Sequence, residues 1–262
     1  MADVKKKNST KKKQKNNVNK VLIAFVIGIL SVSLIVILSF TVFFKVSEIE
    51  TTGSKIYSTE QIAAASGIKS GENLLLISEV DVNTRITKTL PFIASIKIEK
   101  KLPDKVNIVV TETKEYFTVF CNNQYYTSDA GGKILDEISE PLDELILMTV
   151  SDKTKIVIGE TITFNTEREK ELFGLYADFT KESSFKVNFV NISDPYETYI
   201  KLDDRLVAKM GSSSYFGEKI NYLKASMAEI SKDSKGIFDL SAWSPDNNKP
   251  IFSHVDISNY AF

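Results

Sequence analysis

The hydrophobic pattern of the chain is most distinctive near its N-terminus. Residues 21–44 form an uninterrupted, mostly apolar run without a charged side chain, bounded by Lys20 and Lys45. At about 1.5 Å of rise per residue, a helix over this run is longer than the roughly 30 Å hydrocarbon core of a bilayer. A buried core helix is the alternative, but the run shows no polar stripe at helical spacing. The pattern therefore predicts a transmembrane helix at residues 21–44.

The charges that flank this run predict its orientation. Residues 1–20 hold eight lysines and a single acid, Asp3. Such a positive flank stays on the cytoplasmic side of the membrane. The run is too long for the apolar region of a cleaved signal peptide, and its exit at residues 40–44 is bulky. We expect a basic cytoplasmic tail (1–20), which is either a solvated leash or a contact for anionic lipids. We therefore expect all residues after Lys45 to lie on the external side of the cell membrane.

Residues 46–114 carry an orderly alternation that predicts a first external module. A short strand at 46–52 is followed by a helix that opens with Ser58 and Gln61 in capping-box spacing and stops at Gly67. A second helix runs from about residue 80 to 89, where Pro91 blocks its continuation. Two strands then alternate apolar and polar side chains, with the apolar ones at Ala94, Ile96, Ile98, Val106, Ile108 and Val110. The order β-α-α-β-β predicts a three-stranded sheet with both helices on one face.

Residues 115–243 predict a second, mixed α/β domain with a largely antiparallel sheet. The pattern favours helices at about 166–179 and 217–231. It favours strands at 117–121, 124–127, 134–135, 145–150, 186–192, 197–203, 205–210 and 236–240. Residues 244–262 are rich in Pro, Asn, Asp and Ser and are expected to form a flexible tail. The fold class is therefore α+β, with a single transmembrane helix before the two modules.

Composition and charge exclude several functions. Without residues 1–20, 25 basic and 33 acidic residues remain, which argues against nucleic acid as a ligand of the external part. Cys121 and His254 are the only residues of their kinds, so a disulfide within the chain and a zinc site of clustered His and Cys are excluded. Cys121 shares an alternating face with Phe117 and Val119 and is expected to be buried. No Gly-rich phosphate loop appears, so we predict no catalytic residue, metal, cofactor or small-molecule substrate.

The first external module resembles a known family. The match is carried by turn glycines, helix-capping residues and core positions in a fixed order. These are Gly53, Tyr57, Ser58, Ala65, Ser66, Gly67, Gly71, Asn73, Leu74, Leu90, Pro91, Ser95, Lys100, Leu102 and Pro103. They resemble the polypeptide-transport-associated (POTRA) module. With a single N-terminal anchor, the chain resembles the FtsQ/DivIB family of bacterial division proteins.

The resemblance implies a function and a set of partners. A protein of this family would be a single-pass scaffold of the divisome, concentrated at the septum of the cell membrane and catalysing nothing. It would recruit division proteins, among them small coiled-coil proteins similar to FtsB or DivIC and to FtsL. Two other classes remain open, a membrane-anchored cell-wall enzyme and a transmembrane sensor. The lone cysteine without a nearby histidine disfavours the enzyme, and the short basic tail lacks an output domain for a sensor.

The resemblance also implies a partner-binding site near the C-terminus, where an Asp-Leu strand with a free edge receives the coiled-coil partner. Asp239 and Leu240 match, whereas Ser241 stands where the family usually has Arg. Independently, a late strand can offer an open edge, and aromatic side chains are favoured anchors. The alternative is a final core strand with Trp243 folded onto its own domain. The predicted partner-binding residues are Ile237, Phe238, Asp239, Leu240 and Trp243.

Overall fold

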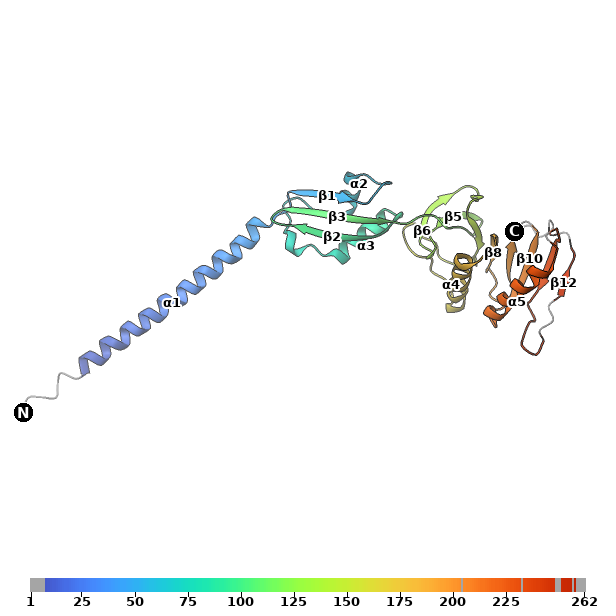
Figure 1. Ribbon diagram of the computed structural model, residues 1–262. Coiled ribbons are helices and arrows are strands. Elements are labelled where there is room, and N and C mark those ends of the chain that lie inside the picture. The colour runs from blue at the N-terminus through green and yellow to red at the C-terminus, as the bar shows by residue number, and fades with distance from the viewer. Residues whose placement is uncertain (1–7, 204, 232, 248–250, 256, 258–262) are drawn as a thin grey trace, which may run out of the picture.

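The computed structural model describes residues 8–203, 205–231, 233–247, 251–255 and 257, with the backbone alone for residues 8–19 and 39–41 (Figure 1). A long helix, α1 (Asn8–Phe43), precedes a three-stranded sheet and a nine-stranded sheet. Within α1, Lys20–Leu38 has a mean hydropathy of 3.2 and none of it is buried. By length and composition α1 is able to cross a membrane. The predicted α+β class is confirmed.

The three-stranded sheet and its two helices are called the POTRA-like module here. Its sheet has the order β1-β3-β2, with β1 parallel and β2 antiparallel to the central strand β3. Its core contains Ile62, Val82 and Ile86 from the helices and Ile108 from β3. The elements are β1 (Glu48–Thr52), α2 (Thr59–Ser66), the short 3-10 helix η1 (Leu74–Leu76), α3 (Glu79–Thr89), β2 (Ile93–Lys101) and β3 (Lys105–Glu112).

The helix signals read from the sequence of this module are correct. The Ser58 hydroxyl accepts a hydrogen bond from the Gln61 amide at 3.3 Å, and the Gln61 side chain accepts one from the Ser58 amide at 2.9 Å. These two bonds satisfy backbone donors that the first turn of α2 leaves free. Gly67 ends the helix with φ of 68°, a left-handed conformation that favours glycine.

The predicted alternation of β2 fails at its first residue. Ile96 is buried as expected, and Ile98 is half-buried, but Ala94 is exposed and Ile93 is buried instead. A bulge between Ile93 and Ser95 shifts the register at this point. An extra residue in one strand turns the preceding side chain to the other face, so strict alternation does not hold across it.

The outer face of the POTRA-like sheet is polar. Lys101 pairs with Glu50 at 2.7 Å across the central strand, and Lys105 pairs with Glu48 at 2.5 Å. Asn107, on β3, donates to Glu99 of β2 at 3.0 Å. The module therefore buries an apolar core on the helix side only and presents charged side chains on the other side.

The second domain is built on the sheet β12-β11-β10-β9-β8-β7-β4-β5-β6. Five of its eight neighbouring strand pairs are antiparallel, and β4–β7, β7–β8 and β10–β11 are parallel. The strands are β4 (Phe117–Cys121), β5 (Gln124–Ser128), β6 (Ile134–Ile138), β7 (Ile146–Thr149), β8 (Val187–Asn191), β9 (Thr198–Leu202), β10 (Leu206–Gly211), β11 (Gly236–Asp239) and β12 (Ile251–Ser253). The largely antiparallel sheet predicted from the sequence is confirmed.

Two helices connect parallel strands of this sheet. α4 (Glu167–Glu182) links β7 to β8, and α5 (Phe216–Glu229) links β10 to β11. They contribute Leu172, Tyr176 and Leu223 to the main core on one face of the sheet. The other face carries a small apolar cluster that includes Val207, Ile237 and Ile257.

The POTRA-like module and the second domain contact each other through polar groups. Lys88 pairs with Glu160 at 2.7 Å, and the Lys133 ammonium donates to the Ile93 carbonyl at 2.7 Å. Thr113, which follows β3, donates to Asp129 at 3.2 Å. The backbone of Gly159 lies so close to the Lys88 carbonyl that a Cβ at this position would collide with it. These four contacts form the joint between the two parts.

Candidate partner-binding edge

The strand predicted to offer a free edge, β11, is paired on both sides. It runs parallel to β10, with Ile237 opposite Val207, and antiparallel to β12, with Phe238 opposite Phe252. The prediction of an open edge at residues 236–240 is therefore wrong, because residues 251–253 return to pair with it. Residues 251–253 lie within the predicted flexible tail at 244–262 and form the strand β12, whereas residues 248–250, 256 and 258–262 lie outside the described part of the chain.

Three of the five predicted binding residues have buried side chains. Ile237 is 6% exposed and belongs to the small cluster on the second face of the sheet. Phe238 and Leu240 are 3% and 0% exposed and belong to the main core. β11 thus directs apolar side chains to both faces of the sheet, and both faces are covered. A partner cannot contact these three side chains while β12 is in place.

Asp239 shapes the end of β11. Its Oδ1 accepts hydrogen bonds from the Ser241 amide at 3.0 Å and from the Ser241 hydroxyl at 2.6 Å. The Leu240 amide still donates to the Lys209 carbonyl of β10 at 2.8 Å. The carboxylate therefore stabilises the turn that leads the chain away from β11, and it is half-buried.

Trp243 follows this turn and is half-buried against the main core. Its ring lies 5.9 Å from the ring of Tyr215, in an edge-to-face arrangement, and Tyr215 is 47% exposed. The indole Nε1 is buried and has no hydrogen-bond partner among the described residues. Trp243 and Tyr215 together form an aromatic pair beside the end of β11, of which Tyr215 was not identified from the sequence.

A buried lysine supports the neighbouring turn. Lys219 of α5 is 1% exposed and donates to the carbonyls of Met210 at 2.6 Å and Ser212 at 3.1 Å. Burial lowers the pKa of Lys219, since the charged form loses its hydration. The ammonium satisfies carbonyls at the end of β10, next to Tyr215. Only the tertiary structure places these carbonyls, so no sequence signal identifies this role.

The outer edge of the sheet at its C-terminal end belongs to β12. Ile251 is 66% exposed, and Phe252 and Ser253 are half-buried. The Phe252 ring packs on Phe238 at 4.7 Å and on His254 at 4.8 Å. A Cβ at Gly236 would collide with the Ser253 carbonyl, so a glycine is required where β12 approaches. The three residues of β12 are too short a pattern to be recognised in the sequence.

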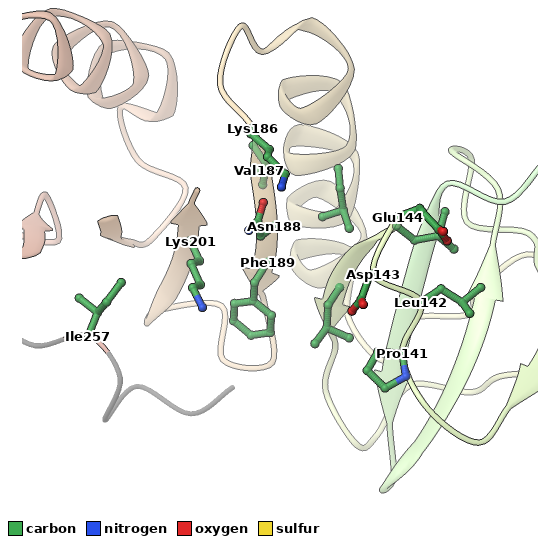
Figure 2. Close-up of a pocket in the computed structure, with 13 residues that line it drawn as sticks. Pro141, Leu142, Asp143, Glu144, Lys186, Val187, Asn188, Phe189, Lys201 and Ile257 are labelled. Carbon is green, nitrogen blue, oxygen red and sulfur yellow. The ribbon is translucent and has the colours of Figure 1, made fainter. Parts of the chain in front are cut away.

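A separate groove lies on the second face of the sheet (Figure 2). Its volume is about 530 Å³, and Phe189 of β8 is part of its lining. Lys186 and Lys201 line it on the side of β8 and β9, whereas Asp143 and Glu144 come from the loop before β7 (Figure 2). Its described lining contains no Ser, Thr, Cys or His.

Cys121, the single cysteine of the sequence, is not placed for nucleophilic catalysis. Cys121 is 1% exposed, which agrees with the predicted buried thiol, and its Sγ lies 3.5 Å from the Ser151 carbonyl. Burial raises the pKa of this thiol, with a smaller contribution from Asp152, and a protonated buried thiol is a poor nucleophile. Among the described residues, no group of three or more His, Cys, Asp and Glu side chains is arranged to hold a metal ion.

Comparison with known proteins agrees with this architecture. The family model described as "POTRA domain, FtsQ-type" matches residues 44–113, which cover the three-stranded sheet and its helices. The cell division protein DivIB of Clostridium botulinum is 27% identical over 237 residues, covering 88% of this chain and 90% of the relative. DivIB of Bacillus subtilis is 22% identical over 238 residues, with 88% and 84% covered. The cell division protein FtsQ of Corynebacterium glutamicum is 24% identical over 200 residues, with 74% and 85% covered.

These similarities extend well beyond the POTRA-like module, since the alignments to both DivIB proteins cover 88% of this chain. They agree with the order of elements in the structure, an apolar N-terminal helix followed by a POTRA domain and a mostly antiparallel sheet domain. The family resemblance read from Gly53, Ser58, Gly67 and Pro103 is thereby confirmed. The matching domain model and the relatives over most of the chain together support the FtsQ/DivIB family of bacterial cell-division proteins as the family that this chain resembles.

Proposed function

We propose that this protein is a single-pass scaffold of the divisome that recruits and links division proteins at the septum through its external domains. The proposal includes the topology predicted from the lysines of residues 1–20, with the N-terminus inside and the two sheets outside. It also includes the absence of catalysis. Its support is the relationship to cell division proteins and the long apolar helix α1.

The observation that carries the scaffold role is the edge strand β12 at the end of the nine-stranded sheet. Its exposed side chain is apolar, Ile251, and no charged residue lies within Ile251–Ser253. An uncharged edge strand offers unpaired backbone groups to a second chain, which gives affinity through main-chain hydrogen bonds. β12 lies near the C-terminus, whereas the anchor helix α1 lies at the N-terminus. A partner bound at β12 would therefore be held away from the membrane, as expected of a scaffold.

We propose that a small coiled-coil partner, similar to FtsB or DivIC and acting with an FtsL-like protein, adds a strand to the outer edge of β12. Trp243 and Tyr215 would provide the aromatic anchor, because Trp and Tyr are enriched among residues that dominate binding energies. The buried residues Ile237, Phe238 and Leu240 would act by holding β11, and thereby β12, in position. Asp239 would act by fixing the turn before Trp243.

A photo-crosslinking experiment tests the partner site. A photoreactive amino acid at position 251 should crosslink to a small coiled-coil division protein in dividing cells, whereas the same probe at Lys97 of the POTRA-like module should not. Trp243→Ala should reduce the crosslink and weaken binding of the purified partner by about 1–4 kcal/mol, the range of an aromatic hot spot. Full crosslinking at 251 with Trp243→Ala would remove Trp243 from the site.

Gly236→Ala distinguishes two modes of binding. The added Cβ collides with the Ser253 carbonyl and should displace β12 from β11. If the partner adds outside β12, the variant loses the partner. If instead the partner replaces β12, the variant binds at least as well as the parent chain, and the binding edge is that of β11.

Topology and location are tested separately. A cysteine in place of Asn8 should resist a membrane-impermeant thiol reagent in intact cells, whereas one in place of Ser214, which is exposed in the second domain, should react. The reverse pattern would overturn the orientation. A fluorescent fusion should collect at the division septum, and a uniform distribution around the cell membrane would contradict the proposed site of action.

A further inference from the structure

Three segments meet at the end of the POTRA-like module where α1 enters it (Figure 1). The chain leaving α1, at 44–47, forms backbone hydrogen bonds with both of the other two. The Leu74 amide donates to the Phe44 carbonyl at 2.8 Å, and the Val46 amide donates to the Glu72 carbonyl at 2.9 Å. The Ser47 amide donates to the Asp104 carbonyl at 2.8 Å. The loop with η1 and the β2–β3 turn are thereby fixed beside the exit of the helix.

Both of these segments expose leucine side chains. Leu76 is 79% exposed and Leu75 is 40% exposed, and both belong to η1. Leu102, in the turn between β2 and β3, is 61% exposed, and Phe43 at the end of α1 is 66% exposed. We call these four residues the anchor-side apolar cluster. The hydrogen bonds above bring the segments that carry these side chains together, and neighbouring exposed apolar side chains mark an interaction site more often than scattered ones do.

The position of this cluster along the membrane normal follows from the length of the helix. About 20 residues of helix cross the hydrocarbon core of a bilayer. Counted from Lys20, this length ends near Phe40, so that residues 41–44 lie at the boundary between acyl chains and headgroups. The segments that carry the anchor-side cluster are hydrogen-bonded to residues 44–47, so the cluster lies at or next to this boundary.

The charges at this end of the module favour apolar insertion over attraction to anionic lipid. Lysines and acids are mixed there, and Lys105 is paired with Glu48. Lys100 is occupied beneath η1, where its ammonium donates to the carbonyls of Leu75 at 3.1 Å and Ile77 at 2.9 Å. These bonds hold the backbone of the turn while its leucine side chains face outward.

We propose that the anchor-side apolar cluster is a lipid-contacting surface, with Leu76 and Leu102 inserted at the headgroup–acyl boundary of the membrane that α1 crosses. The partner is a phospholipid bilayer, zwitterionic as well as anionic, because apolar area and not charge drives the contact. Contact at two loops, in addition to the helix, fixes the tilt of the POTRA-like module against the membrane. The inference rests on the membrane anchoring included in the proposed function.

The test uses the full chain in phosphatidylcholine liposomes. Single cysteines replace Leu76, Leu102, Ile56 or Ile29 in a Cys121→Ala background and carry an environment-sensitive fluorophore. Ile56 is the matched control, since it is 51% exposed but lies at the far end of the module, beside Glu112 at the end of β3. Ile29 lies within α1 and reports anchoring. Lipids with a spin label near the headgroup should quench the probes at 76 and 102 by about twofold or more, and leave the probe at 56 unquenched.

The outcomes separate this inference from the proposed anchoring. Quenching at 29 without quenching at 76 and 102 overturns the lipid-contacting surface and leaves the anchor intact. Loss of quenching at 29 by spin labels placed deep in the bilayer overturns the anchor and this inference with it. Quenching at 76 and 102 only when anionic lipid is added would show attraction of the lysines, and would overturn apolar insertion.

A second variant checks that the leucine side chains themselves carry the contact. Leu76→Asp in the chain labelled at 102 should reduce quenching at 102, whereas Ile56→Asp should leave it unchanged. Circular dichroism of the same samples verifies that both variants fold. Equal quenching in both variants would contradict the proposed role of Leu76.

Discussion

The POTRA-like module and the second domain protect their sheets in different ways. The module has charged side chains on its edge strands, among them Glu48 of β1 and Lys97 of β2, and ion pairs on its uncovered face. The second domain has apolar clusters on both faces of its sheet and an edge strand, β12, without a charged residue. Charged edges discourage the addition of another strand, whereas an uncharged edge permits it.

Under the proposed function, this difference would assign strand addition to the second sheet and not to the POTRA-like sheet. The charged side chains on the edge strands of the POTRA-like sheet disfavour the addition of another strand. The second sheet is long, and its last strand depends on a single neighbour, β11. Four substitutions test the comparison, and their expected effects decrease in the order given below.

The largest effect is expected for Phe238→Ala. This side chain is 3% exposed in the main core, and its removal should lower the free energy of unfolding by about 3–5 kcal/mol. Phe252→Ala, on the half-buried edge strand, should cost only about 1 kcal/mol, because little apolar area is lost there. Urea unfolding of the full chain in detergent, followed by the fluorescence of Trp243, measures both. Equal losses would mean that β12 is as integral to the core as β11.

The next effect concerns binding rather than stability. Ile251→Lys places a charge on the β12 edge, as the POTRA-like module already has on β2. Affinity for the coiled-coil partner should fall about 10- to 100-fold, which corresponds to about 1.4–2.8 kcal/mol. Titration calorimetry measures the affinity, and Ile56→Lys serves as the control with the same change far from the site. Unchanged affinity in Ile251→Lys would exclude strand addition at β12.

A smaller effect is expected for Glu112→Ala in the POTRA-like module. Glu112 Oε1 accepts hydrogen bonds from Ser54 Oγ at 2.7 Å and from the amides of Lys55 and Ile56 at 2.8 and 2.9 Å. Its removal should cost about 1 kcal/mol, since solvent still screens this half-buried carboxylate.

The effect of Glu112→Ala should depend on pH. The bond from Ser54, followed by that from Ile56, lowers the pKa of Glu112 below its ordinary value of 4.5. The stabilisation is therefore fully present above pH 4.5 and is lost as the pH falls through the lowered pKa of the folded state. Thermal unfolding should show a difference between parent and variant at pH 7 that narrows below about pH 4. If the difference in thermal stability between parent and variant did not depend on pH, the ionised carboxylate of Glu112 would not be its source.

The smallest effect is expected for Lys97→Ala. The side chain lies on the exposed side of β2, so the free energy of unfolding should change by less than about 0.5 kcal/mol. Ile96→Ala at the next position should cost about 2–4 kcal/mol, because Ile96 is buried. Circular dichroism in urea measures both variants. Similar losses at the two positions would contradict the register of β2.

Most of the fold could be predicted because its signals are local. The capping box at Ser58 and the glycine stop at Gly67 depend on backbone groups within one helix. The failure at Ala94 has a non-local cause, since the bulge in β2 is defined only by its pairing with β3. A pattern of side chains along one strand does not contain its register with another.

The candidate site was predicted less well than the fold for the same reason. The Asp239-Leu240 match located the last regular strand before the tail, but the return of residues 251–253 to cover its edge depends on contacts such as Phe238 with Phe252. Tyr215 and Lys219 enter the site only through the packing of α5 on β10. Residues that support a site through tertiary contacts carry no signal of their own in a single sequence.

The joint between the POTRA-like module and the second domain restricts the position of one relative to the other. Lys133 bonded to the Ile93 carbonyl, Lys88 paired with Glu160, and Gly159 against the Lys88 backbone prevent the second domain from swinging freely on the first. Under the proposed topology, the distance from the membrane to the β12 edge is set by the two sheets in series. A partner anchored in the same membrane would then reach this edge only if the segment between its own anchor and its binding strand had a matching length.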